Sequence, residues 1–167
     1  MKIGLMLPIA ENDDGAVPRY REIRDAALAA ERDGFDSVWL ADHLLFRWED
    51  QPTRGIWEAW TLLSALAEAT DRVELGSLVM CTAFRNPALL AKMADTLDEV
   101  SGGRLTFGLG AGWHEPEFAA FGYPFDHLAS RSEEALRIIA PLLRTGEADF
   151  SGEYERAVDC VSLPRGP

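Results

Sequence analysis

The segment from Leu105 to Glu115, LTFGLGAGWHE, combines residue types that are typical of a ligand-binding turn. An apolar run leads into three glycines at alternate positions, Gly108, Gly110 and Gly112. Glycine has no Cβ, so the chain can turn sharply and a flat or anionic ligand can approach the backbone. A tight strand-to-helix connection without a ligand explains the same glycines. The residues on either side of the glycines favour the ligand-binding interpretation.

A second polar group follows another apolar run. Asp42 and His43 come directly after SVWLA, from Ser37 to Ala41. An imidazole titrates near neutral pH and can therefore exchange a proton at a reaction site. In the alternative interpretation, Asp42 caps the following turn and His43 is only hydrogen-bonded at the strand end.

The elements that must position these residues alternate along the chain. Apolar runs typical of strands cover 2–8, 37–41, 73–79 and 105–110. Helical spacing of apolar residues follows over about 19–33, 57–69, 86–101 and 130–143. Asn86 and Pro87 predict the start of the third helix, and Ser130 with Glu133 predicts a capping box for the fourth. After Gly146 the sequence predicts irregular structure.

Strand and helix units in this order, with almost continuously apolar strands, indicate an α/β fold with parallel strands covered by helices. An open doubly wound sheet fits this pattern. So does the first half of a (β/α)8 barrel, which typically has about 250 residues. In both architectures the carboxyl ends of the strands form the ligand-binding face. This face would hold residues 42–43, 78–83 and 110–115.

The composition limits the classes of partner. A chain of 167 residues with 47% hydrophobic content suits one globular domain over residues 1–167. Its net charge of -12 disfavours nucleic acid and anionic membranes and leaves a small-molecule substrate or another protein as the partner. The absence of a signal-like start predicts a cytoplasmic protein. Cys81 and Cys160 lack metal-ligand spacing, so we expect free thiols and no metal.

Three segments resemble the luciferase-like monooxygenase family of flavin- or coenzyme F420-dependent oxidoreductases. They are DGFDSVWLADHL over 33–44, ATDRVELGSLV over 69–79 and FRNPALLAKMADTLDEVSGGRLTFGLGAGWHEPEF over 84–118. The resemblance implies a (β/α)8 TIM-barrel type of fold that binds FMN or coenzyme F420 in the barrel mouth. It also implies that this chain holds only the first four βα units, a half-barrel that is truncated before the fifth strand.

The resemblance also implies roles for individual residues. His43 resembles the histidine that acts as acid or base near the deazaflavin, and is the predicted catalytic residue. Leu78 and Val79 resemble the bulge of the third strand behind the cofactor ring, where many members have a non-prolyl cis peptide. The predicted cofactor-binding residues are Asp42, Leu78, Val79, Gly108, Gly110, Ala111, Gly112 and His114.

Ala111 departs from the branch of the family that oxidises a sugar phosphate, in which an acidic side chain stands at this position. A methyl group cannot donate a proton, so we do not carry that substrate over. Glu115 is the nearest carboxylate and is interpreted as a helix cap or surface charge. Hydride transfer or flavin-mediated oxygenation of a small organic substrate remains the expected reaction. The ADH motif at residues 41–43, together with the segment SGGRLTFGLGAGWHE at 101–115, favours F420. The nearby aromatic residues could line an apolar substrate pocket, but we expect most of them to pack in the core or at a subunit interface; they are Trp113, Phe118, Phe121, Tyr123 and Phe125.

Two alternative interpretations assign the chain to other functional classes. A dinucleotide-binding domain is suggested by GLGAG, but these glycines are spaced GxGxG and follow the fourth strand instead of the first. A non-catalytic truncated half-barrel, which self-associates or is inert, is the second alternative. An open half-barrel exposes two strand edges and an apolar sheet face, so we expect a homo-oligomer.

Overall fold

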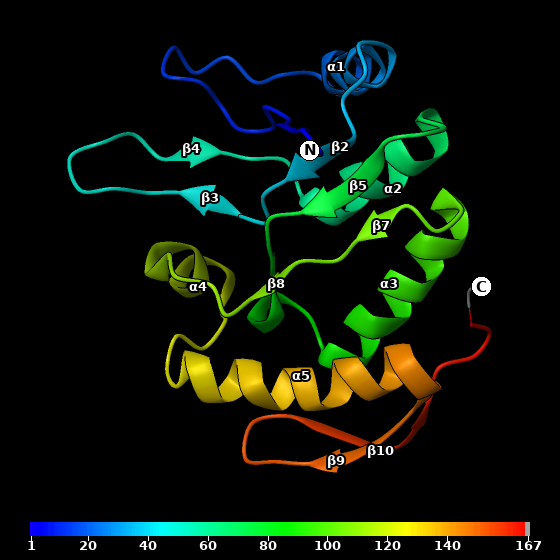
Figure 1. Ribbon diagram of the computed structural model, residues 1–167. Helices are drawn as coiled ribbons and strands as arrows, with labels where there is room; N and C mark the ends of the chain where they lie inside the picture. Colours follow the sequence, from blue (N-terminus) through cyan, green and yellow to red (C-terminus); the bar gives the residue numbers. More distant parts are fainter. Residues whose placement is uncertain (166–167) are drawn as a thin grey trace.

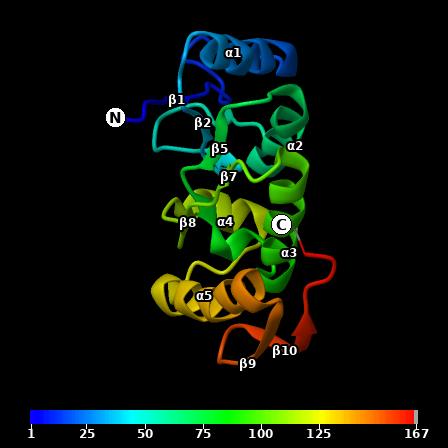
Figure 2. The ribbon, with the colours of Figure 1, turned by 45° about the vertical axis from the view of Figure 1, so that its right-hand side comes forward.

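A four-stranded parallel sheet forms the centre of the molecule in the computed structural model, which describes residues 1–165 (Figure 1). The strands are β1 (Gly4–Met6), β2 (Ser37–Leu40), β5 (Glu74–Ser77) and β7 (Leu105–Thr106), and they pair in that order. The helices between them are α1 (Tyr20–Arg32), α2 (Ala59–Ala69) and α3 (Pro87–Ser101). These helices lie along one side of the sheet (Figure 2). The predicted parallel α/β fold is confirmed.

The third predicted helix begins and ends at the expected signals. The side chain of Asn86 accepts a hydrogen bond from the backbone N–H of Leu89 at 3.0 Å, and Pro87 occupies the first turn. Proline fits there because the missing N–H would have no partner within the helix. Gly102 ends the helix in the left-handed conformation, with φ of 69°.

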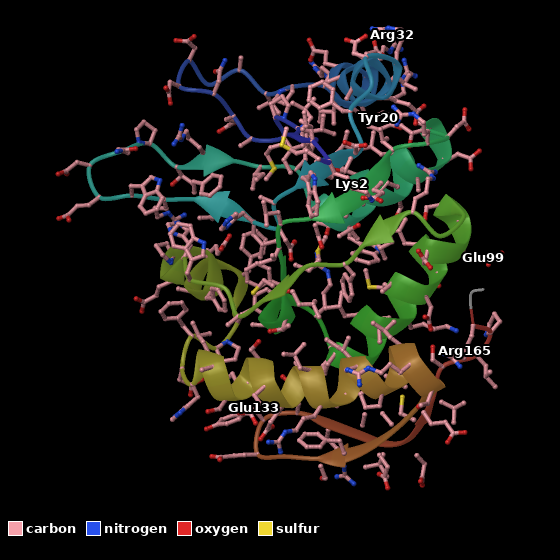
Figure 3. All side chains as sticks on the ribbon, viewed as in Figure 1. Lys2, Tyr20, Arg32, Glu99, Glu133 and Arg165 are labelled. Carbon is pink, nitrogen blue, oxygen red and sulfur yellow. The ribbon has the colours of Figure 1, made fainter. Side chains whose placement is uncertain are left out.

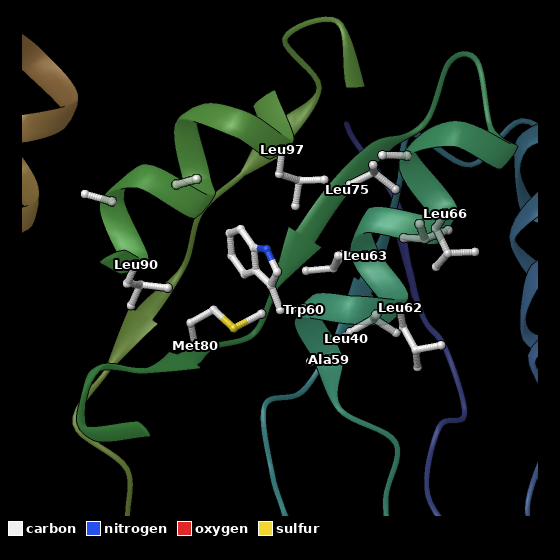
Figure 4. Close-up of a cluster of buried hydrophobic side chains, with 14 of the residues drawn as sticks. Leu40, Ala59, Trp60, Leu62, Leu63, Leu66, Leu75, Met80, Leu90 and Leu97 are labelled. Atoms are coloured by element: carbon white, nitrogen blue, oxygen red, sulfur yellow. The ribbon is translucent and has the colours of Figure 1, made fainter. Parts of the chain in front are cut away.

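The main hydrophobic core lies between the sheet and the helices. Leu40 and Leu75 on the strands are fully buried, and so are Leu63 and Leu90 on the helices (Figure 4). Each such side chain contributes about 1.5–3 kcal/mol when it leaves water. The packing fixes the strands against the helices and leaves the carboxyl ends of the strands free to carry polar groups.

The opposite face of the sheet is covered in part by one indole ring. A Cβ on Gly4 would lie 2.3 Å from Nε1 of Trp39, and a Cβ on Gly76 would lie 2.2 Å from its Cε3. Nε1 of Trp39 donates to the hydroxyl of Ser37 at 2.8 Å. Because side chains alternate along β1, Met6 lies on the same face as Gly4, and it is 45% exposed.

Two predicted strands differ in extent from those in the structure. Residues 73–79 contain β5 alone, and a separate strand β6 (Met80–Cys81) begins just after them, whereas residues 105–110 are divided into β7 and β8 (Leu109–Gly110). The peptide bond from Leu78 to Val79, between β5 and β6, is cis. The Ser77 hydroxyl donates to the carbonyl of Gly108 at 2.9 Å and accepts from its N–H at 3.0 Å, which joins the two strands at the break.

The predicted start of the fourth helix is wrong. Helix α5 (Leu128–Thr145) begins before Ser130, so Ser130 and Glu133 lie inside the helix and form no capping box. The chain enters the helix through His127, which has φ of 49°. Arg131 donates to the carbonyl and the carboxylate of Asp126, each at 3.0 Å, and so ties the turn to the helix.

The prediction of irregular structure after Gly146 is also wrong. Strands β9 (Glu147–Ser151) and β10 (Arg156–Val161) form an antiparallel hairpin that packs against α5 (Figure 1). Glu134 on α5 accepts hydrogen bonds from the backbone N–H groups of residues 153–155 at 2.8–3.0 Å. The hairpin therefore depends on a tertiary contact that no local pattern encodes.

Three further elements lie near the carboxyl ends of the strands. They are the hairpin of β3 (Leu45–Phe46) and β4 (Arg54–Gly55), the short helix η1 (Thr82–Phe84), and the helix α4 (Glu115–Phe121). Charged side chains such as Arg32 and Glu99 project from the outside of the molecule (Figure 3). Within residues 1–165, none of the helices has the length and apolar character needed to span a bilayer.

Candidate functional site

A buried ion pair joins the carboxyl ends of β2 and β5. Asp42 is 4% exposed, and its carboxylate accepts hydrogen bonds from two guanidinium nitrogens of Arg85, at 2.7 and 3.0 Å. The same carboxylate accepts the backbone N–H of Cys81 at 2.9 Å, and Arg85 also contacts Glu58 at 2.5 Å. Burial opposes the charge of Arg85, but the bonds to Asp42 and Glu58 outweigh it and raise the pKa of Arg85.

We use the name strand-end face for residues 42–43, 78–81 and 110–114. Within this group, Asp42 is buried below the surface. Both carboxylate oxygens of Asp42 are engaged by the protein, although the sequence predicts a cofactor contact. Its observed contacts position β6 and η1 against the end of β2.

His43 lies next to a buried carboxylate from a distant helix. Its Nδ1 is 2.9 Å from Oε1 of Glu117, a residue of α4 that is 1% exposed. The other carboxylate oxygen of Glu117 accepts the backbone N–H of Leu44 at 2.8 Å. Sequence reasoning missed Glu117, because Glu115 and Glu117 fit the first turn of a helix equally well. Only the packing of α4 against the chain after β2 distinguishes them.

The other ring nitrogen of His43 faces solvent. Among the described residues, no group makes a hydrogen bond to Nε2, and no buried side-chain nitrogen or oxygen lacks a partner. Nε2 must therefore be accessible. The ring of Phe46 lies 4.8 Å from the His43 ring, and the ring of Trp113 lies 5.5 Å away in an edge-on arrangement. These contacts hold the imidazole in one orientation.

His114, predicted to border the cofactor, is 3% exposed and packs behind the β3–β4 hairpin. Its Nε2 accepts the backbone N–H of Arg47 at 3.1 Å, and its ring lies 4.6 Å from that of Trp48. Burial lowers the pKa of His114. A neutral ring is consistent with an Nε2 that accepts a hydrogen bond. These contacts anchor the hairpin beside His43.

Leu78 and Val79 form an apolar step on the strand-end face. Leu78 is 55% exposed and Val79 is 37% exposed, although both follow the buried strand β5. The peptide bond between them is cis, in agreement with the resemblance. The N–H of Leu78 donates to the carbonyl of Leu40 at 2.8 Å, so this step lies beside the end of β2. An accessible apolar surface at this strand end suits a flat ring.

The glycines are required by contacts within the chain itself. A Cβ on Gly108 would lie 2.3 Å from the carbonyl oxygen of Ser77, and one on Gly110 would lie 2.5 Å from Cγ2 of Val79. Gly112 has φ of +83°, and its Cβ would lie 2.5 Å from Cζ of Phe118. These contacts favour the interpretation of a tight connection. They also make the glycines supports of the Leu78–Val79 step.

Ala111 and Cys81 of the strand-end face offer no reactive group. Ala111 is half-buried, and its carbonyl lies 3.6 Å from the Cys81 sulfur. Burial raises the pKa of the Cys81 thiol to about 11, so it stays protonated at neutral pH. Within residues 1–165, no cluster of three or more His, Cys, Asp or Glu side chains could hold a metal ion.

A flavin or deazaflavin ring fits the residues that this face presents. The apolar Leu78–Val79 step offers a surface for the ring, and Nε2 of His43 is an accessible polar atom on the next strand end. The chain has the fold of a parallel α/β protein, a class in which ligands commonly bind at the carboxyl ends of the strands.

The chain belongs to the luciferase-like monooxygenase family, whose model matches residues 1–167. It is 35% identical over 150 residues to an F420-dependent glucose-6-phosphate dehydrogenase of Amycolatopsis mediterranei, covering 87% of this chain and 44% of the relative. It is 33% identical over 178 residues to the pyrimidine monooxygenase RutA of Rhizobium rhizogenes, covering 99% and 49%. The chain therefore spans about half the length of these relatives.

Solved structures show the same fold. An F420-dependent secondary alcohol dehydrogenase in complex with an F420–acetone adduct superposes with a TM-score of 0.81 and 26% identity, covering 99% of this chain and 49% of that one. The monooxygenase RslO1 of Streptomyces bottropensis gives the same TM-score and identity, covering 99% and 50%. The oxygenating constituent of 3,6-diketocamphane monooxygenase from Pseudomonas putida, in complex with FMN, has a TM-score of 0.78 at 24% identity, covering 94% and 43%.

Proposed function

We propose that this chain is part of a flavin- or F420-dependent oxidoreductase. The cofactor ring would lie on the Leu78–Val79 step, and His43 would be the acid–base residue. The observation that carries the proposal is the open Nε2 of His43 beside an exposed apolar step on the neighbouring strand end. The bound ring would supply the redox chemistry. His43 would exchange a proton with the substrate or the cofactor.

F420 is the preferred cofactor and FMN the alternative. The ADH motif at residues 41–43 favours F420, and relatives that depend on F420 include the two dehydrogenases above. Glucose 6-phosphate is not the substrate that we propose, because Ala111 provides no acidic group. The acidic net charge of -12 favours a small-molecule substrate over nucleic acid.

The substrate would lie against the aromatic rings beside His43. Trp113 is 58% exposed and Trp48 is 40% exposed, and their rings stack with centroids 5.8 Å apart. Exposed aromatic rings next to an acid–base group bind apolar parts of a small organic molecule. Hydride transfer is the first reaction to test, and flavin-mediated oxygenation is the second.

NMR titration tests the location of the cofactor, because it detects weak binding. The amide spectrum of the chain would be followed as oxidised F420, or separately FMN, is added to millimolar concentration. We expect shift changes at residues 42–44 and 78–81. Leu78→Asp should reduce them, because a charge would replace the apolar surface, whereas Leu89→Asp on α3 is a control of equal exposure, at 54% against 55%. Unchanged spectra, or changes confined to another face, would contradict the proposal.

A further inference from the structure

Glu117 is a buried carboxylate to which the sequence patterns assign no role. It lies in the first turn of α4, and its two oxygens are hydrogen-bonded to two consecutive residues of another segment. One oxygen lies 2.9 Å from Nδ1 of His43, and the other accepts the backbone N–H of Leu44. The backbone donor is fixed in place. The carboxylate therefore has one fixed partner and one partner whose protonation it can select.

The geometry determines which tautomer of His43 is compatible with this contact. A carboxylate accepts hydrogen bonds and donates none, so Nδ1 of His43 must carry the proton that lies between the two groups. A neutral imidazole has a single N–H, and Nε2 is then left with its lone pair facing solvent. The other neighbours leave this choice unchanged, because the rings of Phe46 and Trp113 contact His43 without a hydrogen bond and Nε2 of His114 is taken by Arg47.

We propose that Glu117 is a positioning residue that holds His43 as the Nδ1–H tautomer, with Nε2 free to accept a proton. When Nε2 takes a proton, the buried carboxylate stabilises the resulting imidazolium. The use of this device in a reaction rests on the function proposed above. The tautomer itself does not, because it follows from the contacts of His43, Leu44 and Glu117 alone.

Replacing Glu117 by glutamine gives a sharp test. The N–H of Leu44 still requires an acceptor, so the amide oxygen of the glutamine should face Leu44. The amide NH2 group then faces Nδ1 of His43, which must become an acceptor. We therefore expect Glu117→Gln to convert His43 from the Nδ1–H to the Nε2–H tautomer.

The measurement is long-range ¹H–¹⁵N NMR of the imidazole rings, which separates protonated from unprotonated ring nitrogens. The chain has three histidines, and His43→Ala assigns the signal. The matched control is Glu115→Gln, an exposed carboxylate in the same helical turn, which should leave the signal unchanged. Glu117→Asp keeps a group that only accepts, and it should restore the Nδ1–H form. We expect the tautomer ratio to change ~10-fold or more between Glu117 and glutamine.

Two results would overturn the inference. One is an Nε2–H tautomer in the unmodified chain, and this result holds whether or not the variants fold. The other is an unchanged Nδ1–H tautomer in a folded Glu117→Gln variant. The cofactor titration gives a separate answer, since a chain that binds neither F420 nor FMN can still show the Nδ1–H tautomer. Failure of the proposed function is thereby distinguished from failure of this inference.

Discussion

At the scale of single residues, the strand-end face contains side chains that stabilise the fold and side chains that are exposed to solvent. Asp42 and His43 are adjacent in the sequence, yet the first is buried in an ion pair and the second presents a free ring nitrogen. The sequence places both at a strand end, but their roles depend on Arg85 and Glu117, which lie 43 and 74 residues further along the chain. No local pattern could identify these partners.

Asp42→Asn should destabilise the fold strongly. The change removes the buried one of the two carboxylates that compensate Arg85, whose side chain is 12% exposed, and breaking a buried pair costs about 3–5 kcal/mol. Urea denaturation would measure the loss. Asp25→Asn is the control, because the Arg24–Asp25 pair is exposed to solvent and should contribute little to stability. If the two variants lose equal free energy of unfolding, the buried pair contributes no more to stability than the exposed pair.

His43→Ala should lower turnover about 100-fold or more in a luciferase-like enzyme that contains this chain, because a positioned acid–base group is lost. Steady-state kinetics with F420 or FMN would measure the change. His127→Ala serves as a control, since His127 stacks on Tyr154 at the start of α5. If the His43→Ala enzyme turns over at the original rate, His43 has no part in the reaction.

At the scale of elements, the main units could be predicted and the connections between them could not. Helix α3 was predictable because Asn86, Pro87 and Gly102 are local signals. The β9–β10 hairpin was not, because its turn is held by Glu134 from α5. The division of the strands was missed for a similar reason, since it depends on the contact between Ser77 and Gly108.

Gly110→Val should disturb the Leu78–Val79 step and thereby weaken binding of the cofactor ring. A Cβ at residue 110 would lie 2.5 Å from Cγ2 of Val79, and a branched side chain cannot turn away from the contact. The NMR titration with F420 would detect smaller shift changes at residues 78–81. Gly55→Ala is the control, because its Cβ would meet Glu11 at an ordinary 3.5 Å. Circular dichroism must show an intact fold, and undiminished binding by a folded variant would contradict the prediction.

The turn of the β9–β10 hairpin should loosen in acid. Burial works against the charge of Glu134, but hydrogen bonds from the N–H groups of residues 153–155 outweigh it and lower the pKa of this carboxyl below its usual 4.5. A lowered pKa in the folded state means that the stabilisation is present above pH ~4.5 and is lost as the pH falls through the lowered value. NMR shifts of these amides should follow that titration, and Glu134→Gln should abolish it. A midpoint at or above the usual value would contradict the argument.

At the scale of the whole molecule, the chain presents an exposed apolar step at Leu78 and Val79 and spans about half the length of the relatives that it matches. The family could be predicted from three segments of sequence, because these segments contain the ends of β2, β5 and β7 and the residues that follow them. The half-barrel architecture and the oligomeric state remain predictions, because both depend on what packs against the open face around Trp39 and Met6.

The isolated 167-residue chain should bind FMN or F420 more weakly than micromolar and show no measurable turnover. In barrels of this kind, the phosphate end of a ligand is commonly held by the loops after strands seven and eight, and the sheet here has four parallel strands. Ring contacts at Leu78 and Val79 alone leave the charged tail without an anchor and the reacting face open to water. Equilibrium dialysis against each cofactor, with size-exclusion chromatography of the same sample, would measure affinity and oligomeric state together. Micromolar binding by a monomer would contradict this prediction, whereas the same affinity in a dimer would mean that a second copy completes the site.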